Sequence, residues 1–582
     1  MKNSNHNHNQ FIRSIGFLML MSALIFANCK KSVQPIGSSP FEYREIYLPQ
    51  LGPEENRPLS LNTVDDDWGI WGHNLSEVLP DRPSPNVYAK IGNAVDESQF
   101  CFSSKHLFEY ITKYIKDNFG KGQSLRFAIL PNDNSVVCQC KRCVELGNTE
   151  DDASGAVYYM LERLTEYFPN HYFFTSFYRT TCSLPPKPLP ENAGVLISAI
   201  QFPLSACYTP KEDDFIMLLQ HWSAYTKRIY IWDYINNFDD YFTPFPIFEI
   251  FQHRLQIYAK AGVKGVFLNG SGRDYCTFYM LKLHVLSMLL SNPDANWRPI
   301  LRNYCRQTYP VTGDVICDFI VKQENMVANQ ETPISLYDGV PVAVKTYLPA
   351  EEFLKFHQKL QNMLPKTKDN ERKYVEKMVR ATMLTHLELK RMASDTIGCK
   401  QMLQEMAKLT DEDIIAYSES GGTINSYIEE YNYMLKRADE TIGKNLLKGV
   451  KLKPLTELDE DYNDISILTD GLLGLPSCYH CGQLLSSADP ALRIAIPHVE
   501  GLKHIRVNMT RNSIYHISLP LRIVLTANGH VLEEIVPKPS PANLYRSSVD
   551  FCITPLCKGQ LVLIIYRDLE DRTMALDEIE GF

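Results

Sequence analysis

The amino-acid sequence predicts an α/β fold: a (β/α)8 TIM-like barrel, then a helical region, then a C-terminal β-sandwich of the jelly-roll type. The clearest observation is a βαβ unit, in which β-rich runs at 228–234 and 264–268 flank an amphipathic run at 245–261. Such a unit places its strands parallel. Runs of the same two kinds alternate from residue 43 to about 290, the usual size of such a barrel. The pattern then becomes helical, and after residue 453 it changes to short strands.

The N-terminal segment has the features of an export signal. Lys2 and Arg13 supply positive charge, residues 15–27 form an apolar run, and Cys29 follows shortly after this run. The run is too short to span a bilayer comfortably, and the segment resembles a bacterial lipoprotein signal. We therefore expect residues 1–29 to be a signal peptide with a lipidated Cys29, and the protein to be an outer membrane lipoprotein on the periplasmic or cell-surface face. An ordinary secretory peptide cut nearby is the alternative. Residues 30–42, with Ser, Pro and Gly, are predicted to be a linker.

Residues 43–311 are predicted to form the barrel. The eight expected strands lie at 43–48, 68–73, 99–102, 125–130, 172–177, 195–200, 229–234 and 265–268. Helices are expected between them at 105–119, 153–168, 213–225 and 245–261. The second strand has the weakest pattern, so a seven-stranded or imperfect barrel is the alternative.

Residues 312–452 carry apolar side chains at three- and four-residue spacing, which predicts a helical layer packed on the barrel. The expected helices lie at 351–364, 370–393, 402–409 and 411–442. Residues 453–582 contain short runs typical of strands at 491–496, 504–509, 523–526, 549–553 and 561–566. Asn528-Gly529 is a hairpin turn signal, and regularly spaced short strands indicate a β-sandwich.

Six short motifs appear in order along the predicted barrel. They are WGHN (71–74), QFCFS (99–103), PND (131–133) followed by CQCKRC (138–143), IYIWDYINNF (229–238), PFP (244–246) and GVKGVF (262–267). With them, the stretch from residue 44 to about 309 resembles the family known as domain of unknown function 4838. That family is abundant in Bacteroidetes and is similar to glycoside-hydrolase TIM barrels. The resemblance implies a fold and a glycan-related role, but it implies no defined activity.

One difference from the family and one further resemblance bear on function. In the family the last strand often ends in an acid, whereas here it ends Phe267-Leu268-Asn269-Gly270, which leaves open whether Asn269 means a loss of activity. Residues 462–580 resemble a galactose-binding-like or discoidin-type domain. Such domains bind glycans in some proteins and brace an adjacent enzyme in others.

Asp133 and Asp233 are the candidate catalytic pair, because glycoside hydrolysis requires two carboxyl groups. Asp133 follows Asn132 at the end of the predicted fourth strand, where many barrel glycosidases carry an Asn–acid pair whose acid donates the proton. Asp233 closes the predicted seventh strand, where the same enzymes often place the nucleophile. For Asp133, capping or loop hydrogen bonding is the alternative.

Other polar and aromatic side chains at predicted strand ends are candidates for binding a sugar. For His73 the alternative is a histidine that forms its hydrogen bonds within a loop, and for Arg179 the alternative is a surface ion pair. The candidate substrate-binding residues are His73, Asn132, Tyr178, Arg179, Trp232, Tyr234 and Asn269.

The spacing Cys138-x-Cys140-x₂-Cys143 indicates a structural role rather than catalysis. The three thiolates could bind zinc with a fourth ligand such as Cys101, or the cysteines could form disulfides, which export permits. We predict no catalytic metal and no cofactor. The chain contains no nucleophile elbow, phosphate-binding loop or dinucleotide fingerprint.

The sequence therefore predicts an exported glycoside hydrolase or glycan-processing lipoprotein that acts through paired carboxylates. Its expected partners are a glycan, as an oligosaccharide or polysaccharide, and the membrane, through the lipid anchor. Nucleic acid is not an expected partner, since the net charge is −9 and the chain has no basic stripe. A non-catalytic glycan-binding lipoprotein is the alternative.

Overall fold

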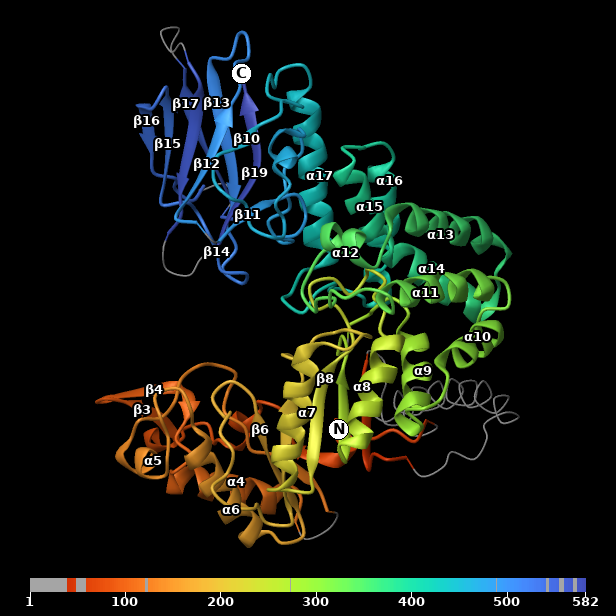
Figure 1. Cartoon of the computed structure of the whole chain (residues 1–582), viewed down its shortest axis with the longest axis vertical. Coiled ribbons are helices and arrows are strands. Elements are labelled where there is room, and N and C mark those ends of the chain that lie inside the picture. The colour runs from red at the N-terminus through yellow and green to blue at the C-terminus, as the bar shows by residue number, and fades with distance from the viewer. Residues whose placement is uncertain are drawn as a thin grey trace, which may run out of the picture.

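The computed structural model describes residues 39–48, 59–120, 124–272, 274–487, 489–540, 544–553, 559–568 and 573–582. The predicted signal peptide with Cys29 and most of the predicted linker lie outside these residues. Within them, the chain forms a mixed α/β part, a helical part and a part built from antiparallel sheets (Figure 1). No helix in the described part of the chain is both long enough and apolar enough to cross a membrane.

A curled parallel sheet of seven described strands forms the first part. Its order is β1-β9-β8-β7-β6-β5-β2, and every neighbouring pair is parallel. β1 and β2 lie at the two edges, so the described strands form a half-barrel rather than a closed ring. The strands are β1 (Tyr43–Tyr47), β2 (Trp68–Ile70), β5 (Arg126–Ala128), β6 (Tyr172–Phe177), β7 (Ala193–Ser198), β8 (Ile229–Tyr234) and β9 (Gly265–Asn269).

The prediction of eight barrel strands needs correction at one element. The predicted third strand, 99–102, overlaps the end of β4 (Ala94–Phe100), which pairs with β3 (Tyr88–Ile91) in a separate antiparallel hairpin. Most of β4 is exposed, including Glu97, whereas the strands of a parallel sheet are buried on both faces. The strands before Asp133 and Asp233 are therefore the third and sixth strands of the sheet in chain order, not the fourth and seventh.

The predicted barrel helices are present with small changes at their ends. Ser104, for example, caps α4 by accepting a hydrogen bond from the Leu107 N–H, and α4 buries Leu107, Ile111 and Ile115. The elements of this part are α3 (Val64–Asp67), η3 (Leu75–Val78), η4 (Pro85–Val87), α4 (Lys105–Asn118), α5 (Lys141–Glu145), α6 (Ser154–Tyr167), α7 (Pro210–Ser223), α8 (Phe248–Lys260) and α9 (Tyr279–Ser291).

The helical part differs from its prediction at two points. The helix expected at 370–393 is divided at Thr382, and the helix expected at 411–442 begins only at Ile424, where Thr423 and Ser426 form a capping box. The elements are α10 (Trp297–Thr308), α11 (Gly313–Val327), α12 (Val340–Thr346), α13 (Ala350–Met363), η5 (Leu364–Lys366), α14 (Asp369–Ala381), α15 (Met383–Met392), α16 (Cys399–Ala407), η6 (Thr410–Glu412) and α17 (Ile424–Thr441).

The C-terminal part contains two sheets that enclose a hydrophobic core of their own. One has the order β10-β12-β18-β15-β16 and the other β11-β19-β13-β17, with the short β14 beside β19. The predicted Asn528-Gly529 turn joins β15 to β16, with both residues at positive φ. The elements are β10 (Lys453–Pro454), η7 (Ile465–Thr469), β11 (Leu484–Ser486), β12 (Ala491–Ile496), β13 (His504–Thr510), β14 (Ile517–Ser518), β15 (Arg522–Ala527), β16 (His530–Ile535), β17 (Arg546–Cys552), β18 (Leu561–Tyr566) and β19 (Thr573–Gly581).

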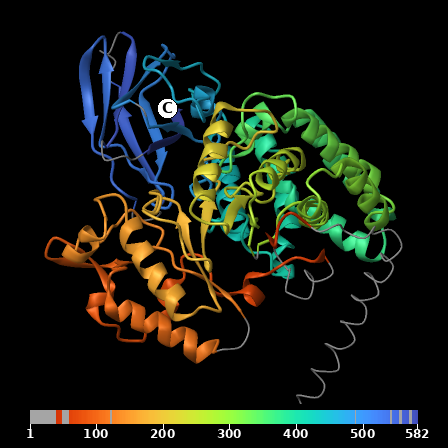
Figure 2. The same cartoon turned by 60° about the horizontal axis from the view of Figure 1, so that its bottom comes forward.

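The helical part lies against the half-barrel (Figure 2). One continuous hydrophobic core extends from β7 and β8 to α17. A smaller core of mainly aromatic side chains fills the inside of the half-barrel, where Tyr230 stacks on Tyr43 with ring centroids 5.5 Å apart. Because this inner core fills the middle of the half-barrel, an open site inside the half-barrel must lie at one end of the strands.

Candidate functional site

A pocket of about 250 Å³ lies at the carboxyl ends of the parallel strands. This is the end at which parallel α/β barrels carry their chemistry. Its walls come from the ends of β5 to β9, from the loop after β2 and from two loops of the helical part. The lining residues are His73, Leu130, Asp133, Ser176, Tyr178, Leu196, Ser198, Ile200, Trp232, Tyr234, Asn269, Tyr337 and Glu419.

Successive side chains of a strand point to opposite faces of the sheet, so only every second residue can reach the pocket. On β8, Tyr230 belongs to the inner core, and Trp232 and Tyr234 follow it on the same face into the pocket. Ile229 and Ile231 belong to the outer core against the helices. The same alternation brings the end of β9 to the pocket at Asn269.

Asp233 lies on the outer face of β8 and does not line the pocket. Its Oδ1 accepts hydrogen bonds from Arg254 Nη1 at 2.5 Å and from the Tyr234 backbone N–H at 2.8 Å, and its Oδ2 accepts one from the Tyr258 hydroxyl at 2.6 Å. The side chains of Asp233 and Arg254 are each 1% exposed. This placement corrects the predicted pairing of Asp233 with Asp133, because Asp233 is buried against α8 whereas Asp133 lines the pocket.

Asp133 does line the pocket. It follows β5 in the Pro131-Asn132-Asp133 turn, its side chain is 51% exposed, and its carboxylate lies 3.2 Å from Arg179 Nε. Arg179 follows β6 and has a left-handed backbone (φ 48°). Arg179 thus contacts the candidate acid rather than lining the pocket itself.

Glu419 supplies a second carboxyl group to the pocket. It lies in a tight loop closed by a backbone bridge between Ala416 and Thr423, and the left-handed Gly421 (φ 83°) permits the turn. The pKa of the Glu419 carboxyl is raised, first by partial desolvation and then by the negative charge of Asp133. Two carboxyl groups therefore interact across one pocket, and Glu419 is the one that holds its proton to higher pH than an ordinary glutamate.

The segment after β8 fixes the two loops that the helical part contributes. The Phe238 backbone N–H donates to the Leu336 carbonyl, next to Tyr337, and the Phe238 carbonyl accepts from the Glu419 N–H, both at 2.8 Å. Tyr337 lies beside Glu419, and burial, followed by the charge of Glu419, raises the pKa of its hydroxyl to about 12. Tyr337 and Glu419 are the two lining residues of the helical part, and the sequence analysis named neither.

His73 and Tyr178 form the wall beside Asp133. His73 Nδ1 lies 2.6 Å from the Pro131 carbonyl, which can only accept, so Nδ1 carries the proton and Nε2 is left as an acceptor in the neutral ring. Burial, followed by the charge of Asp133, raises the pKa of the Tyr178 hydroxyl. Both residues line the pocket.

Asn132 was predicted to bind the substrate, but its side chain is directed to β4 instead of the pocket. Its side-chain Nδ2 donates to the Ser98 carbonyl at 2.8 Å, and its backbone N–H donates to Gln99 Oε1 at 3.0 Å. Asn132 does not line the pocket. It joins the Asp133 turn to the end of β4, which is a positioning role.

The aromatic wall of the pocket is built on Trp232. Its ring stacks on Trp71, with centroids 4.9 Å apart and planes 14° apart. The indole Nε1 of Trp232 has no hydrogen-bond partner among the described residues, although it is buried. The Tyr234 hydroxyl, also at the pocket, lies 3.4 Å from Ser198 Oγ. The pocket thus combines flat aromatic surface with polar groups that a hydroxyl-rich ligand could bind.

A larger hollow of about 720 Å³ lies between the helical part and the C-terminal sheets. One acid that lines it, the half-buried Asp470, lies 4.0 Å from Arg391 Nη1 in an ion pair. No residue from the strand ends lines this hollow, and among the described residues that do line it the only other acid is Asp464, which caps η7. We therefore place the candidate site at the smaller pocket.

Comparison with known proteins gives one family. The sequence model of the family described as "Domain of unknown function (DUF4838)" matches residues 28–320, just over half of the 582-residue chain. This is the family that the ordered motifs predict. No curated protein matches the chain.

Three of the solved structures that match are distant. A family GH115 4-O-methyl-α-glucuronidase with specificity for decorated arabinogalactans is 12% identical, with 82% of this chain and 66% of that chain covered and a TM-score of 0.35. A GH138 enzyme targeting pectin rhamnogalacturonan II is 8% identical, with 94% and 87% covered and a TM-score of 0.33. A fucose-binding module from Streptococcus pneumoniae is 16% identical, with 24% and 97% covered and a TM-score of 0.19. TM-scores this low assign neither a fold nor a function.

Proposed function

We propose that this chain, which belongs to the family described as domain of unknown function (DUF4838), hydrolyses a glycosidic bond in an oligosaccharide or polysaccharide. The observation that carries the proposal is the pair of carboxyl groups, Asp133 and Glu419, in one aromatic-walled pocket at the carboxyl ends of the parallel strands. Glycoside hydrolysis needs one carboxyl group to protonate the leaving oxygen and another to attack the sugar or activate water.

The environments of the two groups support a division of roles between them. Glu419 has the raised pKa, so it keeps a proton to donate and acts as the general acid. Asp133 lies on the same pocket, 3.2 Å from Arg179 Nε, and acts as the second carboxyl group, the nucleophile or base. This assignment reverses the role predicted for Asp133 and replaces Asp233 by Glu419. The rings of Trp232, Tyr178 and Tyr337 offer flat surfaces for the C–H faces of a sugar.

The test is hydrolysis of a panel of glycans by the purified protein, followed by the variants Asp133→Asn and Glu419→Gln. General acid–base groups contribute about 10²- to 10⁴-fold to rate, so each variant should lose turnover by that factor while unfolding at the same denaturant concentration. Glu419→Gln should regain rate on glycosides with a good leaving group, which need no proton.

Matched controls use exposed acids away from the pocket. Asp151→Asn, in the loop before α6, and Glu429→Gln, on α17, should leave turnover unchanged. Equal losses in these controls, or full turnover in Asp133→Asn, would remove the assignment.

A second candidate is glycan binding without catalysis. It is favoured by Asn269, which gives the pocket an amide where the family often carries an acid, and by the engagement of Asp133 with Arg179. It predicts saturable oligosaccharide binding with no product, and binding that Trp232→Ala abolishes.

The proposal extends to location and to the C-terminal sheets. The chain is proposed to be an outer membrane lipoprotein anchored through Cys29, and Cys29→Ala should release it from the membrane fraction. Residues 453–582 are proposed to be a galactose-binding-like domain that braces the enzyme part. In support, the Tyr479 hydroxyl donates to Asp239, in the loop after β8, and Arg437 of α17 lies 3.2 Å from Glu580 of β19.

A further inference from the structure

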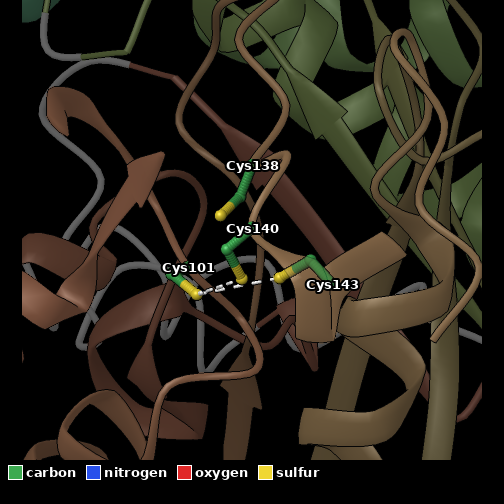
Figure 3. Close-up of side chains that lie close together, drawn as sticks. All are labelled: Cys101, Cys138, Cys140 and Cys143. Carbon is green, nitrogen blue, oxygen red and sulfur yellow. Dashed lines mark hydrogen bonds between the residues drawn. The ribbon is translucent and has the colours of Figure 1, made fainter. Parts of the chain in front are cut away.

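Four cysteines, one at position 101 and three within residues 138–143, converge beside the half-barrel. The Sγ atoms of Cys101, Cys138, Cys140 and Cys143 all lie within 4.8 Å of one another. Figure 3 shows the four side chains pointing toward a common centre, with Cys101 in contact with both Cys140 and Cys143. Three of the four residues are buried, and Cys140 is half-buried.

Three chain segments deliver these thiols. Cys101 follows the last residue of β4, Cys138 and Cys140 lie in the loop after β5, and Cys143 lies in α5. The loop is held against the hairpin by the Gln139 N–H, which donates to the Lys90 carbonyl at 2.8 Å. The cluster is therefore formed by tertiary packing of the β3–β4 hairpin against the β5–α5 loop.

The spacing of the sulfur atoms fits a tetrahedral metal site. Cys101 Sγ lies 3.7 Å from Cys140 Sγ and 3.7 Å from Cys143 Sγ. Zinc–sulfur bonds of about 2.3 Å in a tetrahedron place neighbouring sulfur atoms about 3.8 Å apart. Sulfur atoms joined in a disulfide are only about 2.05 Å apart.

Hydrogen-bond donors surround the cluster as they surround thiolate ligands. The Lys90 backbone N–H donates to Cys138 Sγ at 3.3 Å. Ser103 Oγ lies 3.1 Å from Cys143 Sγ and 3.3 Å from Cys101 Sγ, so its hydroxyl can donate to a metal-bound thiolate. Such second-layer donors orient ligands and offset their negative charge.

We propose that Cys101, Cys138, Cys140 and Cys143 bind one Zn²⁺ ion as a structural site. Four soft thiolates in a tetrahedron suit Zn²⁺, and because the protein fills all four positions no position is open for catalysis. Binding releases the thiol protons to solvent and changes no oxidation state. The inference does not depend on the proposed hydrolysis.

The ion would fix the turn that carries Asp133. Gln99, two residues before Cys101, donates through Nε2 to the Asn132 carbonyl at 3.1 Å and accepts from the Asn132 N–H at 3.0 Å. The metal therefore joins the hairpin to the β5–α5 loop at one end, while Gln99 joins them next to Asp133. Loss of the metal should loosen residues 131–143 before the rest of the chain.

The test measures metal in the full chain, purified without chelators or reductant, by elemental mass spectrometry. We expect about one zinc per chain, released by a mercurial thiol reagent and absent from Cys138→Ser and Cys143→Ser. The control Cys552→Ser removes an exposed cysteine of β17 and should keep its zinc. Metal loss should also speed hydrogen exchange of residues 131–143.

Disulfides are the alternative to be excluded, since Cys478 and Cys481 are disulfide-bonded in the same chain. The wild-type protein decides this even where a variant fails to fold. Denatured in chelator without reductant, it should be alkylated at all four cysteines, as peptide mapping would show. Alkylation only after reduction would demonstrate disulfides, and reduced cysteines without metal, or with iron in place of zinc, would also overturn the proposal.

Discussion

Asp133 and Asp233 both follow or end a strand of the parallel sheet and both pair with an arginine, yet their surroundings are opposite. The Asp133–Arg179 pair is about half exposed at the pocket, whereas both side chains of the Asp233–Arg254 pair are 1% exposed. The exposed carboxylate is free to exchange its partner for a ligand. The buried one has its oxygens occupied by Arg254, Tyr258 and a backbone N–H. An acid at a strand end is thus a candidate for chemistry only when its face of the strand opens to solvent.

The buried pair connects β8 to α8, so its expected role is structural. Arg254 and Tyr258 are one turn apart on α8 and both reach Asp233. Arg254 also donates to the Phe202 carbonyl, which extends the connection to the segment after β7. Residues that tie three elements together in this way stabilise the fold around the pocket without entering it.

The largest expected effect comes from breaking the buried pair. Arg254→Met leaves Asp233 uncompensated in the core, so the free energy of unfolding should fall by about 3–5 kcal/mol. Urea unfolding followed by circular dichroism measures the change. The double variant Asp233→Leu/Arg254→Met should recover most of the loss, because no buried charge is then left. A loss of less than about 1 kcal/mol in the single variant would mean that Asp233 is not confined as described.

The element pattern of the sheet could be predicted from the sequence, because apolar strand runs and amphipathic helices alternate over the whole region. The predicted strand at 99–102 failed as a barrel strand because its apolar residues belong to the end of a hairpin, where Phe100 and Phe102 pack under α4. A window of four residues cannot distinguish such a strand end from a buried parallel strand. The charged residues Asp96 and Glu97, directly before it, were the available signal.

Only those residues of the candidate site that lie at or after the strand ends could be predicted from the sequence. His73, Asp133, Tyr178, Trp232, Tyr234 and Asn269 line the pocket, as their strand-end positions predict. The orientation of Asp233 could not be predicted, since both faces of a parallel strand are buried and its residues show no polar alternation. The position of Glu419 at the pocket could not be predicted either, because it depends on a contact between Phe238 and a loop some 180 residues later in the chain. Gly421-Gly422 was the one local signal that the predicted helix is interrupted there.

The two carboxyl groups of the pocket, Asp133 and Glu419, should determine how activity depends on pH. The pKa of Glu419 is raised by desolvation and by Asp133, so the proton needed by a general acid is retained above the ordinary glutamate range. Activity should fall about tenfold per pH unit once the pH exceeds this raised value. The dependence of kcat/KM on pH, with unfolding monitored in the same buffers, measures it. Activity that stays constant up to about pH 9 would contradict a protonated Glu419.

The smallest expected effect on stability comes from the exposed pair. Arg179→Met removes a half-exposed, solvent-screened interaction, so the free energy of unfolding should change by only about 0–1 kcal/mol. The change should shrink further in high salt, which screens exposed charges. Turnover should nevertheless fall, because the Asp133 carboxylate loses the cation that holds it at the pocket. Urea unfolding and initial rates on the same preparation separate the two quantities. If Arg179→Met destabilised the chain as much as Arg254→Met, the distinction between a pocket pair and a structural pair would fail, and with it the reason for choosing Asp133 over Asp233.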